Sequence, residues 1–114
     1  MKTRLGSLIA ALLLTMAAVA PAAAGSNGQQ ARLFNSTYTS NACIAGYNQN
    51  NYWVRACWWL WNTGQGQHND LANYWFKYTV TIDRTDNDGN ILATRSDCYV
   101  PVSQPSDWYS CLAP

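Results

Sequence analysis

Residues 73–83 alternate between two kinds of side chain along their whole length, and this alternation constrains the fold more than any other feature of the chain. Every second position is apolar or aromatic: Tyr74, Phe76, Tyr78, Val80 and Ile82. The positions between them hold Trp75, Lys77, Thr79, Thr81 and Asp83. A period of two in aromatic and β-branched residues is typical of a half-buried strand, whereas an amphipathic helix needs apolar positions three and four apart. The sequence therefore predicts an all-β fold.

The first 24 residues have the features of an export signal. Lys2 and Arg4 precede an apolar run at residues 8–20, which ends in Pro21 and three alanines. Signal peptidases accept this order of charged start, apolar middle and small-residue end, and the run is too short for a spanning helix of about 20 residues. We predict a signal peptide at residues 1–24, one secreted β domain at residues 25–114, an extracellular or periplasmic location, and no membrane insertion.

Four cysteines follow the predicted signal: Cys43, Cys57, Cys98 and Cys111. A domain of about 90 residues buries only a marginal core, and exported domains of this size use disulfides to compensate. Several pairings are possible. We favour Cys43 with Cys57 and Cys98 with Cys111, because each pair closes a short loop and contributes about 3 kcal/mol by restricting the unfolded chain. The fold class that follows is a small, disulfide-stapled antiparallel β-sandwich or partly open barrel.

The Asn-Asp-Gly sequence at residues 87–89 suits a three-residue hairpin loop, since Gly89 tolerates the positive φ that closes such a loop. This loop sets Ile82 opposite Thr94. A two-residue loop would set Ile82 opposite Arg95 and bury a charge against the apolar face, so we predict the three-residue loop.

Residues 51–55 repeat the order asparagine, tyrosine, tryptophan, apolar residue and cation found at residues 73–77. If both segments are strands, the inward side chains of the earlier one are Tyr52, Val54, Ala56, Trp58 and Leu60. Its outward side chains are then Trp53, Arg55, Cys57, Trp59 and Trp61. We expect a further short strand at residues 33–39 and a loop at residues 41–51, where Gly46 and four asparagines indicate turns.

The charge of residues 25–114 excludes two classes of partner. Five cations stand against six aspartates, and there is no glutamate, so the net charge is near −1. Nucleic-acid binding depends on clustered cations that neutralise phosphates, and anionic membranes attract the same clusters. We therefore expect neither nucleic acid nor a membrane surface as a partner.

Few residues are suited to catalysis or metal binding. His68 is the only histidine, and it lies in a predicted polar loop two positions before Asp70. Each acid is an aspartate in a turn or on a polar strand face, where we expect it to be solvated, whereas glycoside hydrolysis needs two carboxyl groups that flank one bond. Zinc sites use closely spaced cysteine pairs, which are missing, and Arg84 stands where an EF-hand would have its first ligand. We predict no enzyme activity, no metal and no cofactor.

Aromatic and amide side chains point instead to binding. The chain has six tryptophans, seven tyrosines and two phenylalanines, together with 11 asparagines and six glutamines. Aromatic faces stack on sugar rings and amides bind hydroxyls without charge, although tryptophans also fill β cores. Our leading hypothesis is a secreted, non-catalytic protein that binds polysaccharide or a cell surface. Its candidate binding residues are Trp53, Arg55, Trp59, Trp61, Trp75 and Lys77.

The alternative is a proteinaceous inhibitor of a glycosidase or other secreted hydrolase, or a toxin-like protein, because tryptophan and arginine dominate protein interfaces. The sequence resembles small secreted α-amylase inhibitors of the tendamistat type in residues 52–55 between the first two cysteines, in residues 78–83 and 98–100, and in its Cys111-Leu112 ending. It lacks their contiguous Trp-Arg-Tyr and spaces its cysteines differently. The resemblance implies a two-disulfide β-sandwich and a secreted protein partner.

Overall fold

The structure is a computed structural model that describes residues 25–114, so the predicted signal peptide lies outside the described residues. The described part contains six strands and no helix, which confirms the all-β prediction. The strands are β1 (Gln29–Asn35), β2 (Asn41–Tyr47), β3 (Trp53–Trp59), β4 (His68–Thr85), β5 (Ile91–Val100) and β6 (Trp108–Ala113).

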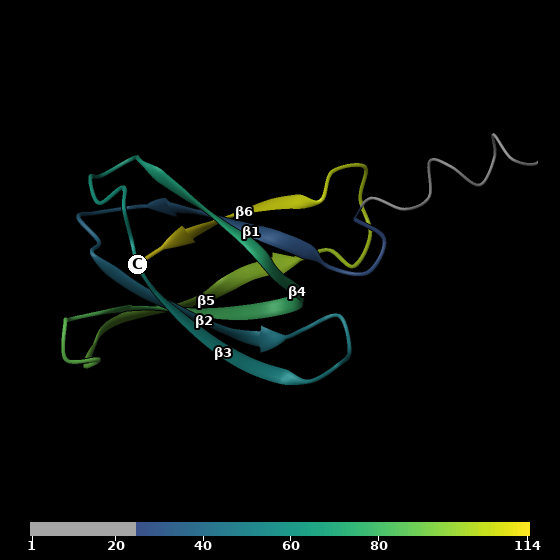
Figure 1. The fold of residues 1–114 in the computed structure, drawn as a ribbon, viewed down its shortest axis with the longest axis horizontal. Coiled ribbons are helices and arrows are strands. Elements are labelled where there is room, and N and C mark those ends of the chain that lie inside the picture. The colour runs from purple at the N-terminus through teal and green to yellow at the C-terminus, as the bar shows by residue number, and fades with distance from the viewer. Residues whose placement is uncertain (1–24) are drawn as a thin grey trace, which may run out of the picture.

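All six strands belong to one sheet, which bends along its longest strand, β4 (Figure 1). The first half of β4 pairs with β1, whereas its second half pairs with β2 on one side and β5 on the other. We call β1, β6 and the first half of β4 the three-stranded arm. The four-stranded arm consists of β3, β2, the second half of β4, and β5. The sheet is mixed rather than purely antiparallel as expected, because β6 runs parallel to β1.

The core lies where the two arms face each other, and both arms contribute to it. Its largest fully buried apolar side chains are Leu33, Ile44, Leu71, Phe76, Ile82, Val80 and Val100. The two disulfides are Cys43–Cys57 and Cys98–Cys111, which confirms the favoured pairing. The first joins neighbouring strands β2 and β3, while the second joins β5 to β6 and so links the two arms.

The strand predicted at residues 73–83 exists and is longer than expected, but its alternation is interrupted. Phe76, Val80 and Ile82 are buried as predicted, whereas Tyr74 and Tyr78 are exposed. Asn73 and Tyr78 have φ values of 70° and 67°, in the left-handed region. The register between β4 and β1 shifts around Asn73, and the register between β4 and β2 shifts around Tyr78. These bulge-like irregularities interrupt the alternation, so the side chains next to them do not follow the period of two.

The hairpin between β4 and β5 has the predicted three-residue loop. The backbone N–H of Asp86 donates to the carbonyl of Asn90 at 3.0 Å, and the N–H of Gly89 donates to the carbonyl of Asp86 at 3.2 Å. Gly89 has a φ of 85°. The predicted register beyond the loop is wrong, because a register shift between Arg84 and Thr85 sets Ile82 opposite Arg95, and a second shift follows between Ile82 and Val80. Arg95 is not buried by this pairing, since its Nε donates to Asp97 Oδ1 at 2.7 Å on the surface.

Residues 53–59 form a strand, as predicted from the order of residues that 51–55 share with 73–77. Val54, Ala56 and Trp58 are partly buried, and Leu60 is buried. Tyr52 was expected inside, but it precedes the strand and is exposed. The first strand lies at residues 29–35 rather than 33–39, and residues 41–47 form β2 rather than a loop.

Candidate functional site

Four aromatic rings form a continuous row across the outer face of the four-stranded arm. Each ring comes from a different strand: Trp53 from β3, Tyr47 from β2, Tyr78 from β4 and Tyr99 from β5. The ring centroids of successive neighbours lie 5.2, 6.3 and 6.5 Å apart. We call these four residues the aromatic band. Since they are 56%, 42%, 40% and 58% exposed, the band is surface rather than core.

Strand register brings two of these rings together and places a third near Tyr78. Tyr47 lies directly opposite Trp53 in the β2–β3 pair, and Tyr99 lies opposite Thr79, the residue after Tyr78. Side chains opposite each other in antiparallel strands share one face, so the pairing of β2 with β3 places two of the rings side by side. Tyr47 and Tyr99 were not among the predicted site residues, because only the register reveals their positions.

Tyr78 joins the band through its unusual backbone. The alternation predicted that its ring would be buried with Phe76 and Val80, but a φ of 67° turns it to the outer face between Tyr47 and Tyr99. A left-handed backbone costs a residue with a Cβ atom about 1–2 kcal/mol. Costs of this kind are often found at functional sites, where the required geometry outweighs the loss of stability.

Tyr78→Gly should therefore cost less stability than Tyr99→Gly, by about 1–2 kcal/mol. Both changes remove one exposed ring, but only glycine at position 78 also relieves a left-handed backbone. Urea denaturation of the two variants measures the difference. If Tyr78→Gly is the less stable variant, the backbone at this position is not strained.

Lys77 was predicted to face outward with the tryptophans, and this is wrong. It is only 5% exposed, and its Nζ donates to Asn27 Oδ1 at 3.1 Å and to the carbonyl of Gln49 at 3.4 Å. The ammonium also lies 5.6 Å from the centre of the Tyr78 ring. The bulge at this point of β4 explains the reversal, and Lys77 supports the band from beneath instead of contacting a ligand.

The middle of the outer face is polar but electrically balanced. Arg55 is exposed, as predicted, and its Nη2 lies 3.4 Å from Asp83 Oδ2. Thr94 donates to the other carboxylate oxygen of Asp83 at 2.7 Å. The hydroxyls of Thr81 and Ser96 lie 3.2 Å apart nearby. This region therefore offers hydroxyl groups and one paired cation next to the aromatic band.

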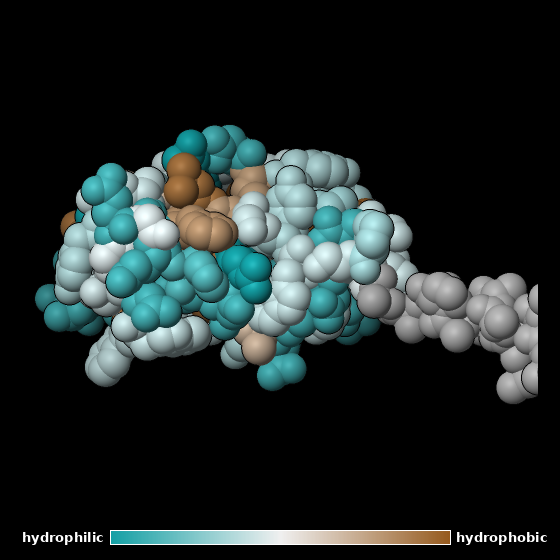
Figure 2. Space-filling model, turned by 90° about the horizontal axis from the view of Figure 1, so that it is seen from above, coloured by the Kyte–Doolittle hydropathy of each residue, from teal (hydrophilic) through white to brown (hydrophobic). Residues whose placement is uncertain are grey.

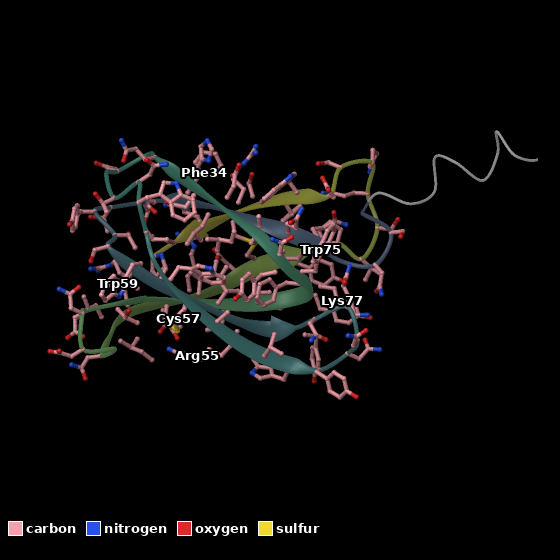
Figure 3. The ribbon with its side chains drawn as sticks, in the orientation of Figure 1. Phe34, Arg55, Cys57, Trp59, Trp75 and Lys77 are labelled. Carbon is pink, nitrogen blue, oxygen red and sulfur yellow. A yellow bond between two sulfur atoms is a disulfide. The ribbon has the colours of Figure 1, made fainter. Side chains whose placement is uncertain are left out.

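The remaining predicted tryptophans do not form a single site. Trp59 is 83% exposed on the same face of β3 as Trp53, at a distance of about 20 Å along an extended strand. It lies beside a shallow depression of about 190 Å³. Trp61 is exposed beyond the end of β3, and Trp75 is half-buried near the bend of β4. Figure 3 shows Trp59, Cys57 and Arg55 following one another along β3, apart from Trp75 and Lys77.

The three-stranded arm contains the chain's single histidine, His68, which lies beside an ion pair. His68 Nδ1 lies 3.3 Å from Asp70 Oδ1, and Arg32 donates to the same oxygen at 2.7 Å. The hydrogen bond from Arg32 holds the pKa of Asp70 below its usual value, which keeps this carboxylate ionised and unsuited to donating a proton. Figure 2, which views the molecule from above Figure 1, shows a surface that is mostly hydrophilic to neutral, with a small group of hydrophobic residues near its upper middle and a few others at its edges.

Comparison of the chain with protein-family models, curated proteins and solved structures finds no match. Within residues 25–114, no helix is long and apolar enough to cross a membrane. The same residues contain no group of three or more histidine, cysteine, aspartate or glutamate side chains that could hold a metal ion.

Proposed function

We propose that this chain is a secreted, non-catalytic protein that binds a neutral polysaccharide on the outer face of its four-stranded arm. The observation that carries the proposal is the aromatic band, in which four exposed rings from four strands form one continuous surface. Isolated exposed aromatic residues are ordinary, but a contiguous exposed apolar surface usually marks a binding site.

The chemistry of the surrounding face favours sugar over a charged ligand. Aromatic rings pack on the C–H faces of sugar rings, while hydroxyls such as those of Thr81 and Ser96 can bind sugar hydroxyls. Arg55, a cation on this face, is paired with Asp83. Trp59 extends the surface along β3, so a long chain has a second place to stack.

The architecture supports display of such a surface outside the cell. Two disulfides in a small domain are compatible with an extracellular location. We infer that the bent sheet corresponds to the partly open barrel rather than to the sandwich, since a single strand, β4, belongs to both arms. Its outer face then remains free for a ligand, while its inner face forms the core.

A second candidate, inhibition of a secreted hydrolase, rests on Trp53 and Arg55. These two residue types are enriched at interface hot spots, and here they are exposed two positions apart on one face of β3. The two candidates differ in their dependence on the cation. Arg55→Ala should leave polysaccharide binding unchanged, but it should weaken inhibition if a protein is the ligand.

Sedimentation with insoluble cellulose, chitin and starch tests the proposal. The wild-type protein should bind at least one of them, and Trp53→Ala or Tyr99→Ala should raise its Kd about tenfold or more, which corresponds to about 1.4 kcal/mol or more. Tyr38→Ala is the matched control, because Tyr38 is 63% exposed in the loop between β1 and β2, outside the band. Equal losses in all three variants, or no binding to any of the polysaccharides, would refute the proposal.

A further inference from the structure

A hollow of about 300 Å³ lies between β3 and the part of β4 that precedes the bend. Among the described strands β3 pairs only with β2, so its other edge is free and forms one wall of the hollow. The remaining lining includes four amide side chains and two aromatic ones: Asn48, Gln49, Asn50, Asn73, Tyr74 and Trp75. This composition differs from that of the aromatic band, and none of the band residues lines the hollow.

The amides that line the hollow are available for a ligand. Within residues 25–114, the side-chain amides of Gln49, Asn50 and Asn73 make no hydrogen bond to the rest of the chain. Each therefore keeps both donor and acceptor capacity. Their number matters, because three amides around one hollow can satisfy several hydroxyl groups of the same small molecule.

The backbone that holds these amides is fixed before any ligand arrives. Asn48 Oδ1 accepts hydrogen bonds from the N–H groups of Asn50 and Tyr52, at 2.9 and 3.0 Å, and this orders the turn between β2 and β3. On the opposite wall, the N–H of Asn73 donates to Gln30 Oε1 at 2.7 Å. A preordered site loses less conformational entropy when it binds.

Aromatic side chains, among them Tyr74 and Trp75, line part of the hollow. Tyr74 is 46% exposed and packs edge to face on Trp58, with the ring centroids 5.0 Å apart. Trp75 is half-buried beside it. Aromatic rings next to amides without a hydrogen-bond partner are a combination that suits a neutral sugar.

We propose that this hollow is a second sugar site, which takes a neutral mono- or disaccharide unit. Its volume lies at the lower end of the range for small-ligand pockets, which suits a ligand of this size. Arg55 reaches the rim, but it is paired with Asp83, so the site has no net attraction for anions. The inference deepens the proposed function, since it gives a second and separate site for the same class of ligand.

NMR titration of the ¹⁵N-labelled full domain with cellobiose, maltose and N,N′-diacetylchitobiose tests this proposal. At least one of these sugars should shift the side-chain amide signals of Gln49, Asn50 and Asn73. Asn73→Gly should raise the Kd of that sugar about tenfold or more, because glycine keeps the left-handed backbone of φ 70° and removes only the amide. Asn50→Ala, in the exposed turn, should also weaken binding without any change at a strained position.

The two sugar sites can fail independently. Trp53→Ala should leave disaccharide shifts at the hollow unchanged, even though it weakens polysaccharide binding at the band. The hollow proposal is overturned if none of the three sugars shifts the amide signals, or if the shifts persist with unchanged affinity in both Asn73→Gly and Asn50→Ala. It is also overturned if an extended peptide, pairing with the free edge of β3, is the only ligand that shifts these signals.

Discussion

Phe76→Ala should lower the free energy of unfolding by about 3–5 kcal/mol, the usual cost of truncating a fully buried phenylalanine. Phe76 is 1% exposed and lies where β4 changes partners: it pairs with Gln29 of β1, while the next residue, Lys77, pairs with Tyr47 of β2. Domains of this kind have a total stability of about 5–15 kcal/mol, so the variant should be largely unfolded at 37 °C if the protein lies at the lower end of that range.

Urea denaturation measures this effect, with Thr79→Ala as the control. Thr79 is on the same strand and is exposed, so its truncation should change stability by no more than about 0.5 kcal/mol. A loss below about 1 kcal/mol in Phe76→Ala would mean that the bend of β4 does not depend on this side chain.

Replacing Cys98 and Cys111 together with serine should lower the free energy of unfolding by about 3 kcal/mol, because the disulfide closes a 13-residue separation in the unfolded chain. The native structure should respond locally as well. Among the described strands β6 pairs only with β1, and this disulfide ties it to β5 across the two arms. The amides of β6 should then exchange with solvent faster than those of β2.

The matched control is the double serine variant of Cys43 and Cys57. That disulfide has a similar sequence separation of 14, but it joins directly opposite residues on neighbouring strands. Its removal should cost a similar free energy without selective exchange in β6. Equal exchange in β6 and β2 after loss of Cys98–Cys111 would show that the disulfide does not hold the arms together.

Local patterns in the sequence were sufficient to predict the all-β class, the disulfide pairing and the loop at residues 87–89, but not the mixed, bent sheet. Each depends on residues close together in the chain, such as the period of two in β4 or the glycine that closes the turn. The strand β3 was also predictable, because Trp53, Arg55 and Trp59 repeat the outward positions of an alternating pattern.

The strand β2 was missed because Gly46 was interpreted as a turn residue. In the structure its lack of a side chain has a packing role: a Cβ atom there would lie 2.8 Å from Val80 Cγ1 and 3.5 Å from Phe76 Cδ1. Glycine in a strand often marks such a close approach. Only the tertiary arrangement distinguishes this role from a turn.

The candidate site was only partly predictable for a related reason. The alternation of side chains along a strand correctly predicted that Trp53, Arg55 and Trp59 are exposed. The same alternation wrongly placed Tyr78 inside and Lys77 outside. A bulge interrupts the alternation, and this sequence gives no clear signal for one. Tyr78 has a positive φ, which tyrosine rarely adopts, so its residue type does not indicate the bulge. Tyr47 and Tyr99 complete the band through strand register, which depends on long-range pairing.

The most direct test of the aromatic band is an NMR titration of the ¹⁵N-labelled domain with a soluble fragment of the polysaccharide that it sediments with. The indole signal of Trp53 and the backbone amides of Tyr47, Tyr78 and Tyr99 should shift together and saturate at one Kd, while the indole signal of Trp108 on the three-stranded arm should not move. Shifts confined to Trp108 and its neighbours, with an unchanged Trp53 signal, would contradict a sugar site on the four-stranded arm.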